Sequence, residues 1–178
     1  GVGTYQFGLY IDKNNLTVRG YDASNAAITN PSNAAVEFTT GSTANFGPSG
    51  IFVQGNNVTL DGLKIGDNYD NSNVISSNKS IEVIGDAFTM SNCWLNTSSD
   101  EGAFYMGEWD PSHPIVTYTL TNNRFTNALV SINNGAGQTG AVSGRVITNN
   151  TFDGFITPYL IGFRGWNGAS PVQGWIVS

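Results

Sequence analysis

Apolar and polar positions recur along the chain in one pattern, with a spacing of 30 residues between the two most similar copies and 27 between the last two. The segments 51–60 (IFVQGNNVTL) and 81–90 (IEVIGDAFTM) place Ile, Val, Gly and Thr in the same columns. An earlier copy lies at 9–18 (LYIDKNNLTV), and looser copies end in YTLTNNRF (118–125) and RVITNNTF (145–152). Such a repeat of strand-like units indicates a solenoid, because one unit cannot bury its apolar side chains alone.

Within each copy, apolar and polar residues alternate with the period of a β-strand. Ile51, Val53, Val58 and Leu60 share one face across the Gly-Asn-Asn break, and Thr59 points the other way. This alternation puts one side of each strand in the core and the other in water. No segment keeps a 3.6-residue apolar period, so we expect little or no α-helix.

Three short strands per repeat can be read from the pattern. The first runs into a turn and a second strand at 60–65, and third strands are expected at 103–106, 129–132 and 159–163. Three strands per turn predict an all-β parallel β-helix (β-solenoid) of five to six coils, with residues 1–178 forming one domain. Two inner columns are predicted, Leu60, Met90, Leu120 and Ile147 in one and Ile65, Leu95, Phe125 and Phe152 in the other.

A third column lies at the bend between strands and contains Leu63, Cys93, Asn123 and Asn150. Stacked asparagines can hydrogen-bond one another and the turn backbone, which stabilises a conformation that other residues avoid. We interpret them as structural rather than as ligands. Cys93 is expected to be a small buried hydrophobe.

Composition narrows the function classes. The 178-residue chain has 11% charged residues and a net charge of −6, which argues against nucleic-acid binding. No run of about 18 apolar residues is present, so no membrane insertion is expected. One cysteine excludes an intrachain disulfide framework. The many Asn, Ser and Thr residues favour an extracellular or cell-surface protein.

The opening GTYQFGLYIDKNNLTVRG (3–20) resembles the first coil of right-handed parallel β-helices of the pectate-lyase-like superfamily. The later TNNRF and TNNTF are similar to the Asn-Asn-x-Phe turns of that family. The resemblance implies the fold and its right hand. Family enzymes use clustered aspartates, or Ca²⁺-binding acids with an Arg or Lys base, and no matching motif occurs here. No catalytic residue can therefore be transferred.

One loop is richest in chemical groups. Carboxylates accept hydrogen bonds from sugar hydroxyls, aromatic rings offer flat faces to pyranose rings, and paired carboxylates can cleave glycosidic bonds. Three interpretations of this loop are possible. It is a solvated loop in which Trp109 covers the edge of the core, a surface that contacts a glycan, or a catalytic site. The candidate residues are Asp100, Glu101, Tyr105, Glu108, Trp109, Asp110 and His113.

A second loop, 67–73, carries alternating oxygen side chains, and Asp67 and Asp70 are candidate Ca²⁺ ligands. The loop lacks the Gly and Glu of an EF-hand, so a polar turn is the alternative. Ca²⁺ is the one cofactor the sequence suggests.

No cap is recognisable at either end of the repeat. Trp175, Ile176 and Val177 match the start of a further coil. An uncapped solenoid exposes unpaired backbone. We therefore expect a segment of a longer protein or, alternatively, a subunit that associates end to end.

Three functional hypotheses follow. The first is a non-catalytic extracellular module with a scaffolding, adhesive or glycan-binding role, whose partner is a polysaccharide or cell-surface glycan. The second is part of a polysaccharide lyase or glycoside hydrolase acting on acidic polysaccharide. The third is a filament subunit. The missing catalytic motifs favour the first, whereas fold analogy alone supports the second.

Overall fold

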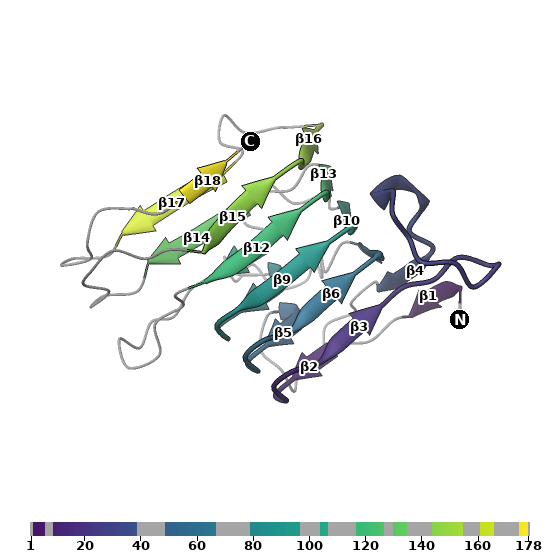
Figure 1. The fold of residues 1–178 in the computed structure, drawn as a ribbon, viewed down its shortest axis with the longest axis horizontal. Coiled ribbons are helices and arrows are strands. Elements are labelled where there is room, and N and C mark those ends of the chain that lie inside the picture. The colour runs from purple at the N-terminus through teal and green to yellow at the C-terminus, as the bar shows by residue number, and fades with distance from the viewer. Residues whose placement is uncertain are drawn as a thin grey trace, which may run out of the picture.

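The computed structural model describes residues 2–5, 9–38, 49–66, 79–96, 104–106, 117–126, 130–134, 144–154, 161–165 and 175–177. These residues form three parallel sheets of six strands each (Figure 1). Sheet A consists of β1 (Gly3–Tyr5), β4 (Val36–Phe38), β7 (Leu63–Ile65), β10 (Trp94–Asn96), β13 (Arg124–Thr126) and β16 (Thr151–Asp153). Sheet B consists of β2 (Leu9–Ile11), β5 (Ser49–Val53), β8 (Lys79–Val83), β11 (Phe104–Met106), β14 (Val130–Asn134) and β17 (Ile161–Gly165). Sheet C consists of β3 (Thr17–Arg19), β6 (Thr59–Asp61), β9 (Phe88–Ser91), β12 (Tyr118–Thr121), β15 (Arg145–Thr148) and β18 (Trp175–Val177).

The chain passes through sheets A, B and C in turn, and each such passage is one coil. Strands β1 to β3 form the first coil and β16 to β18 the sixth. Every strand pairs in parallel with its equivalent in the next coil, as in the five-residue ladder between β14 and β17. The fold is a parallel β-helix with three strands per coil, which confirms the predicted architecture. Among the described residues, no helix is long and apolar enough to cross a membrane.

The core consists of inward-facing columns that run through the coils. Leu60, Met90, Leu120 and Ile147 are in register and at most 2% exposed. The predicted column of Ile65, Leu95, Phe125 and Phe152 is also in register, and the last two rings stack with centroids 4.9 Å apart. Burial of these side chains removes apolar surface from water and is the main source of stability.

A ladder of asparagine side chains lies inside the bend between sheets C and A. The Asn123 side chain accepts a hydrogen bond from the Cys93 amide (3.0 Å) and donates to the Met90 carbonyl (2.9 Å) and to Asn150 Oδ1 (3.0 Å). One coil further, Asn150 repeats the arrangement by donating to the Leu120 carbonyl (2.9 Å). Asn123 is only 1% exposed. The predicted structural role of this column is confirmed.

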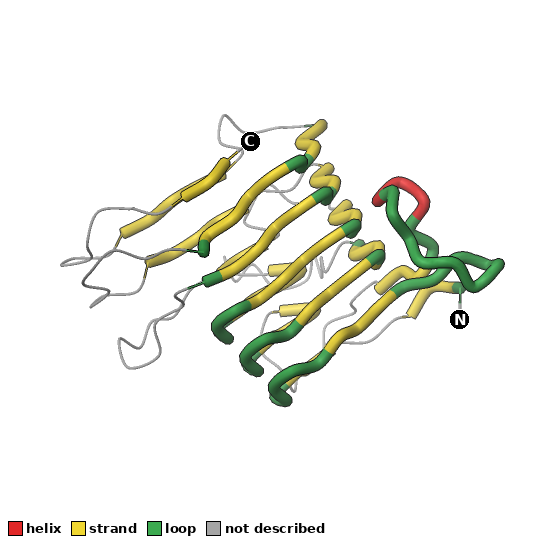
Figure 2. Tube along the Cα trace, in the orientation of Figure 1, coloured by secondary structure: helices red, strands yellow, loops and turns green. Residues whose placement is uncertain are grey.

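The described turns between the sheets lie one above another in successive coils (Figure 2). Residues in the left-handed backbone region recur at two of these corners. At the corner from sheet B to sheet C the described residues with positive φ are Asn15, Asn57, Ala87 and Gly144. At the corner from sheet C to sheet A they are Gly62, Asn92, Asn122 and Asn149. Asn and Gly tolerate this backbone region better than other residues, which explains why the sequence repeats them there.

An excursion of the chain at residues 20–35, which we call the corner arm, separates the first coil from the second (Figure 2). It contains a short 3₁₀ helix at Pro31–Asn33, whose first turn is capped by the Asn30 side chain. Ile28 is 4% exposed and lies against Gly62, where any added Cβ would be 2.8 Å from the Ile28 Cβ. The repeat pattern did not predict this arm.

We expect Asn123→Ala to lower the free energy of unfolding by roughly 2 kcal/mol or more, because each buried polar group left unsatisfied costs about 1–3 kcal/mol. Chemical denaturation monitored by circular dichroism measures the effect. Asn96→Ala, a partly exposed position on the outer side of sheet A, is the matched control and should change stability little. Equal losses in the two variants would contradict a supporting role for the ladder.

Candidate functional site

Most of the residues that the sequence singled out lie outside the described part of the chain. This applies to Asp67, Asp70, Asp100, Glu101, Glu108, Trp109, Asp110 and His113. Tyr105 is the exception, because it is the central residue of β11 and its backbone is described. It is in register with Glu82 of β8 and Ser131 of β14. Neither the candidate loop nor the candidate Ca²⁺ ligands are tested by the structure.

Chain connectivity relates all these residues to one sheet. Residues 97–103 connect β10 to β11, and residues 107–117 connect β11 to β12. Residues 67–78, which contain the candidate Ca²⁺ ligands, connect β7 to β8. Strands β8 and β11 are neighbours in sheet B. Every predicted site residue therefore belongs to sheet B or to a connection that enters or leaves it.

The outer side of sheet B carries an aromatic and acidic row, which we call the sheet B row. It runs in register from Tyr10 through Phe52 and Glu82 to position 105. The rings of Tyr10 and Phe52 stack with centroids 5.7 Å apart and planes 4° apart. Tyr10 is 40% exposed, and its hydroxyl donates to the Gln54 side chain. The row thus combines exposed aromatic surface with polar groups that hydrogen-bond.

The outer side of sheet A carries a different row, in which charges alternate around a tryptophan. Glu37 forms an ion pair with Lys64 (2.9 Å), and the Lys64 ammonium lies 5.1 Å from the centroid of the Trp94 ring. The Arg124 guanidinium lies 4.9 Å from the same ring and pairs with Asp153 (2.7 Å). Lys64 and Arg124 come from the strands on either side of β10.

The side chain of Trp94 is held by contacts with both neighbouring coils. Its ring contacts one cation from each neighbouring coil, and its indole N–H donates to Thr126 (3.0 Å). Burial by itself would raise the pKa of Asp153, but hydrogen bonds from Thr126 and Arg124 outweigh burial and lower it. The positive and negative side chains of this row pair with one another. We therefore interpret the row as stabilising the stack of coils rather than as binding a ligand. Cation–π contacts of this kind contribute about 0.5–1 kcal/mol at exposed sites.

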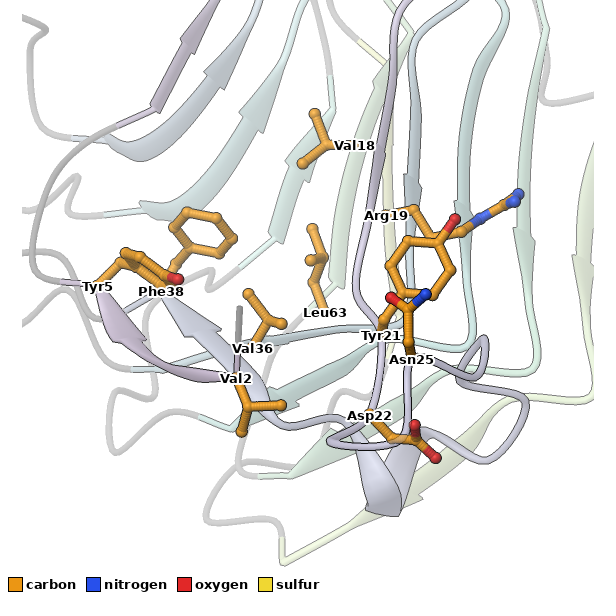
Figure 3. A pocket seen from close by; sticks show the side chains of 10 residues that line it. All are labelled: Val2, Tyr5, Val18, Arg19, Tyr21, Asp22, Asn25, Val36, Phe38 and Leu63. Atoms are coloured by element: carbon orange, nitrogen blue, oxygen red, sulfur yellow. The ribbon is translucent and has the colours of Figure 1, made fainter.

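A pocket of about 280 Å³ lies at the first coil, between sheet A, sheet C and the corner arm (Figure 3). Most of its lining is apolar: Val2, Tyr5, Val18, Val36, Phe38 and Leu63. Tyr21, Asp22 and Asn25 line it from the arm (Figure 3). Tyr5 and Tyr21 therefore line the same pocket, whereas Trp94 lies in the row on the outer side of sheet A.

The charged groups at this pocket have partners of their own. The Asp22 carboxylate accepts hydrogen bonds from the Ala26 amide, the Ser24 hydroxyl and the Ser24 amide, which lower its pKa. Arg19 donates from Nε to Asp61 (2.7 Å), and this bond raises the pKa of Arg19. In Figure 3 the Arg19 guanidinium extends away from the apolar lining. The pocket is the apolar end of the core and has no convergent catalytic groups among the described residues.

A buried cation is a feature that the sequence did not reveal. Arg145 begins β15 on its inner side and is 1% exposed. It follows Phe88 and Tyr118 in their register column, so an arginine continues a column of aromatic rings. Burial lowers the pKa of Arg145, while Tyr118 and Asp86 act in the opposite direction. The alternation in β15 makes this position an inner one. Charge alone would favour an exposed position.

Metal binding finds no support in the part of the chain that the structure describes. No three His, Cys, Asp or Glu side chains gather closely enough there to hold an ion. Cys93 is fully buried, and burial raises the pKa of its thiol to about 12. A thiol in this state is a poor nucleophile and a poor metal ligand. The expectation that Cys93 is a small core residue is confirmed.

Comparison with known proteins adds no relative: no family model, curated protein or solved structure matches the chain.

We expect Cys93 to resist thiol reagents at pH 8 in the native protein, because its raised pKa keeps it protonated at that pH. A colorimetric thiol assay measures the reaction. The same protein in denaturant is the control and should release one equivalent, since Cys93 is the only cysteine. Rapid labelling without denaturant would show that the bend opens or that the thiol is activated.

Proposed function

We propose that this protein is a non-catalytic glycan-binding module of an extracellular or cell-surface protein, with the outer side of sheet B as its binding face. We further propose that it is a right-handed β-helix of the pectate-lyase-like superfamily, on the basis of the motifs in residues 3–20 and the Asn-Asn-x-Phe turns. The ligand is a polysaccharide or a cell-surface glycan.

One observation carries the proposal. The sheet B row and all the predicted site residues belong to the same sheet or to its connections. Tyr10 and Phe52 supply aromatic surface, and Glu82 supplies a carboxylate in the same register. The backbone of Tyr105 is in register with Glu82 on the neighbouring strand. The acidic residues between positions 100 and 110 lie within a few residues of β11 in the sequence.

The spacing of this row suits a linear ligand. Neighbouring strands in a sheet lie about 4.7–4.9 Å apart, so side chains of successive coils form a straight line along the axis of the helix. Aromatic residues provide a large apolar face and, in tyrosine, a polar group that hydrogen-bonds. Each ring of a polysaccharide has apolar faces and hydroxyl groups at its edge. A straight line of aromatic and polar side chains can contact several successive rings.

The other two candidate regions fit this role less well. On sheet A, Trp94 contacts Lys64 and Arg124, so cations already cover the ring that a sugar would need. At the first coil, the pocket is mostly apolar and its charged groups have intramolecular partners. Sheet B therefore supports glycan binding better than either.

We expect Tyr10→Ala to weaken glycan binding by up to about tenfold, which corresponds to about 1.4 kcal/mol. The loss of the ring removes both its own contact surface and the stacking that orients Phe52. A glycan array that includes acidic polysaccharides, with and without Ca²⁺, identifies the ligand, and titration measures the affinity.

Tyr21→Ala is the matched control, because Tyr21 is 41% exposed, close to the 40% of Tyr10, but lies in the corner arm. It should leave binding unchanged. Equal weakening by both variants, or no binding to any glycan, would contradict the proposal. Release of shortened products from an acidic polysaccharide would instead show a lyase or hydrolase.

A further inference from the structure

The outer side of sheet C carries a column of four threonines on four successive coils. Thr17, Thr59, Thr89 and Thr119 are in register with one another, and Val146 continues the column with a branched side chain of similar shape. Thr59, Thr89 and Thr119 each lie between two buried residues, so they face outward. Thr17 is exposed and in register with Thr59. No formal charge occurs in this column.

A second column of hydroxyl side chains runs parallel to the first, two residues further along each strand. It contains Ser91, Thr121 and Thr148 in register. The hydroxyls of Thr121 and Thr148 lie 3.2 Å apart and hydrogen-bond, and Ser91 donates to Asp61 (2.9 Å). Asp61 in the second coil and Arg19 in the first continue this column and form an ion pair. We call the two columns together the threonine face.

The threonine face has a fixed two-dimensional repeat. Strand pairing sets about 4.7–4.9 Å along the axis of the helix, and a step of two residues sets about 6.6–6.8 Å across it. The left-handed corners hold both borders in place. Asn57 donates to Asn15 (2.8 Å) at one border, and Asn122 donates to Asn92 (2.6 Å) at the other. The β-branched threonine side chains on these strands have few alternative χ1 rotamers.

This face is accessible. Thr17 is exposed, and Thr59, Thr89 and Thr119 are partly exposed. No hydrogen bond among the described residues engages the hydroxyls of these last three. Figure 1 shows the strands of sheet C side by side, with no described element crossing in front of β6, β9 and β12.

We propose that the threonine face binds ice. The repeats along and across the sheet are close to the repeats of water oxygens in the prism planes of hexagonal ice. Each threonine offers a hydroxyl that replaces one water in such a lattice and a methyl group beside it that orders the neighbouring water. The column of four threonines has no charge, which suits a neutral crystal surface.

Other partners match this face less well. A nucleic acid requires a basic surface, and the threonine column contains no cation. A soluble glycan is bound by aromatic surface, whereas the described outward residues of β6, β9, β12 and β15 are Thr, Asp, Ser and Val. A regular array of identical small side chains gains most from a ligand that is itself periodic.

The test is thermal hysteresis of the purified chain, measured by nanolitre osmometry, together with inhibition of ice recrystallisation. We expect faceted crystal growth and a measurable freezing-point gap. Thr89→Tyr should abolish both effects, because a ring in the centre of the column prevents flat contact. Thr151→Tyr places the same ring at an exposed outward position of sheet A and should leave both effects intact.

Circular dichroism and thermal denaturation establish that both variants fold. Thr89→Val, which keeps the branched shape, should retain part of the hysteresis. The proposal is wrong if the unmodified chain shows neither hysteresis nor recrystallisation inhibition, or if folded Thr89→Tyr is as active as the unmodified chain. Adsorption to crystalline cellulose or chitin without activity on ice would also overturn it.

Discussion

The register between successive coils is the constraint on which the rest of this structure depends. Backbone pairing alone would allow a parallel strand to slip along its neighbour, and a slip of one residue would turn core side chains outward. The corners prevent this. Asn123 and Asn150 bind the backbone of the coil beneath them inside one bend, and residues with positive φ stack outside it. Each strand is thereby fixed at its ends rather than along its length.

Because the register is fixed, the outward side chains of each sheet form straight rows that face the solvent. Sheet A shows ion pairs around Trp94, sheet B shows aromatic rings and a carboxylate, and sheet C shows hydroxyl groups. The three rows share one scaffold, and their differences lie only in outward residues that the core does not restrict. A β-helix can therefore change the ligand of one face without altering the other two.

The sequence predicted what depends on period and alternation. Ile51 and Ile81, together with the columns that continue from Leu60 and Ile65, occupy the places that the repeat assigned to them. Alternation also distinguishes Phe52 as an outward aromatic residue, far in sequence from the loop that contains Trp109. The outward positions of the predicted strands thus mark the sheet B row from Tyr10 to Glu82.

What the sequence could not predict depends on contacts between residues far apart in the chain. The environment of Trp94 is set by Lys64 and Arg124, each 30 residues away, and only the register brings them to one ring. The corner arm interrupts the repeat, and no periodic signal indicates where such an insertion packs. Arg145 is buried because its position in the repeat is an inner one, even though its charge favours water.

The corner arm also alters how this stack can come apart. In a solenoid whose coils touch only their neighbours, an end coil can fray while the others stay folded. Here the arm receives hydrogen bonds from Asn122 at the Thr29 carbonyl and from Arg124 at the Ser32 hydroxyl, across 93 and 92 positions of sequence. These bonds join the connection between the first two coils to the corner between the fourth and fifth. When the first coil unfolds, contacts in the middle of the stack are therefore lost as well. We expect the arm to make unfolding more cooperative than it would be if each coil contacted only its neighbours.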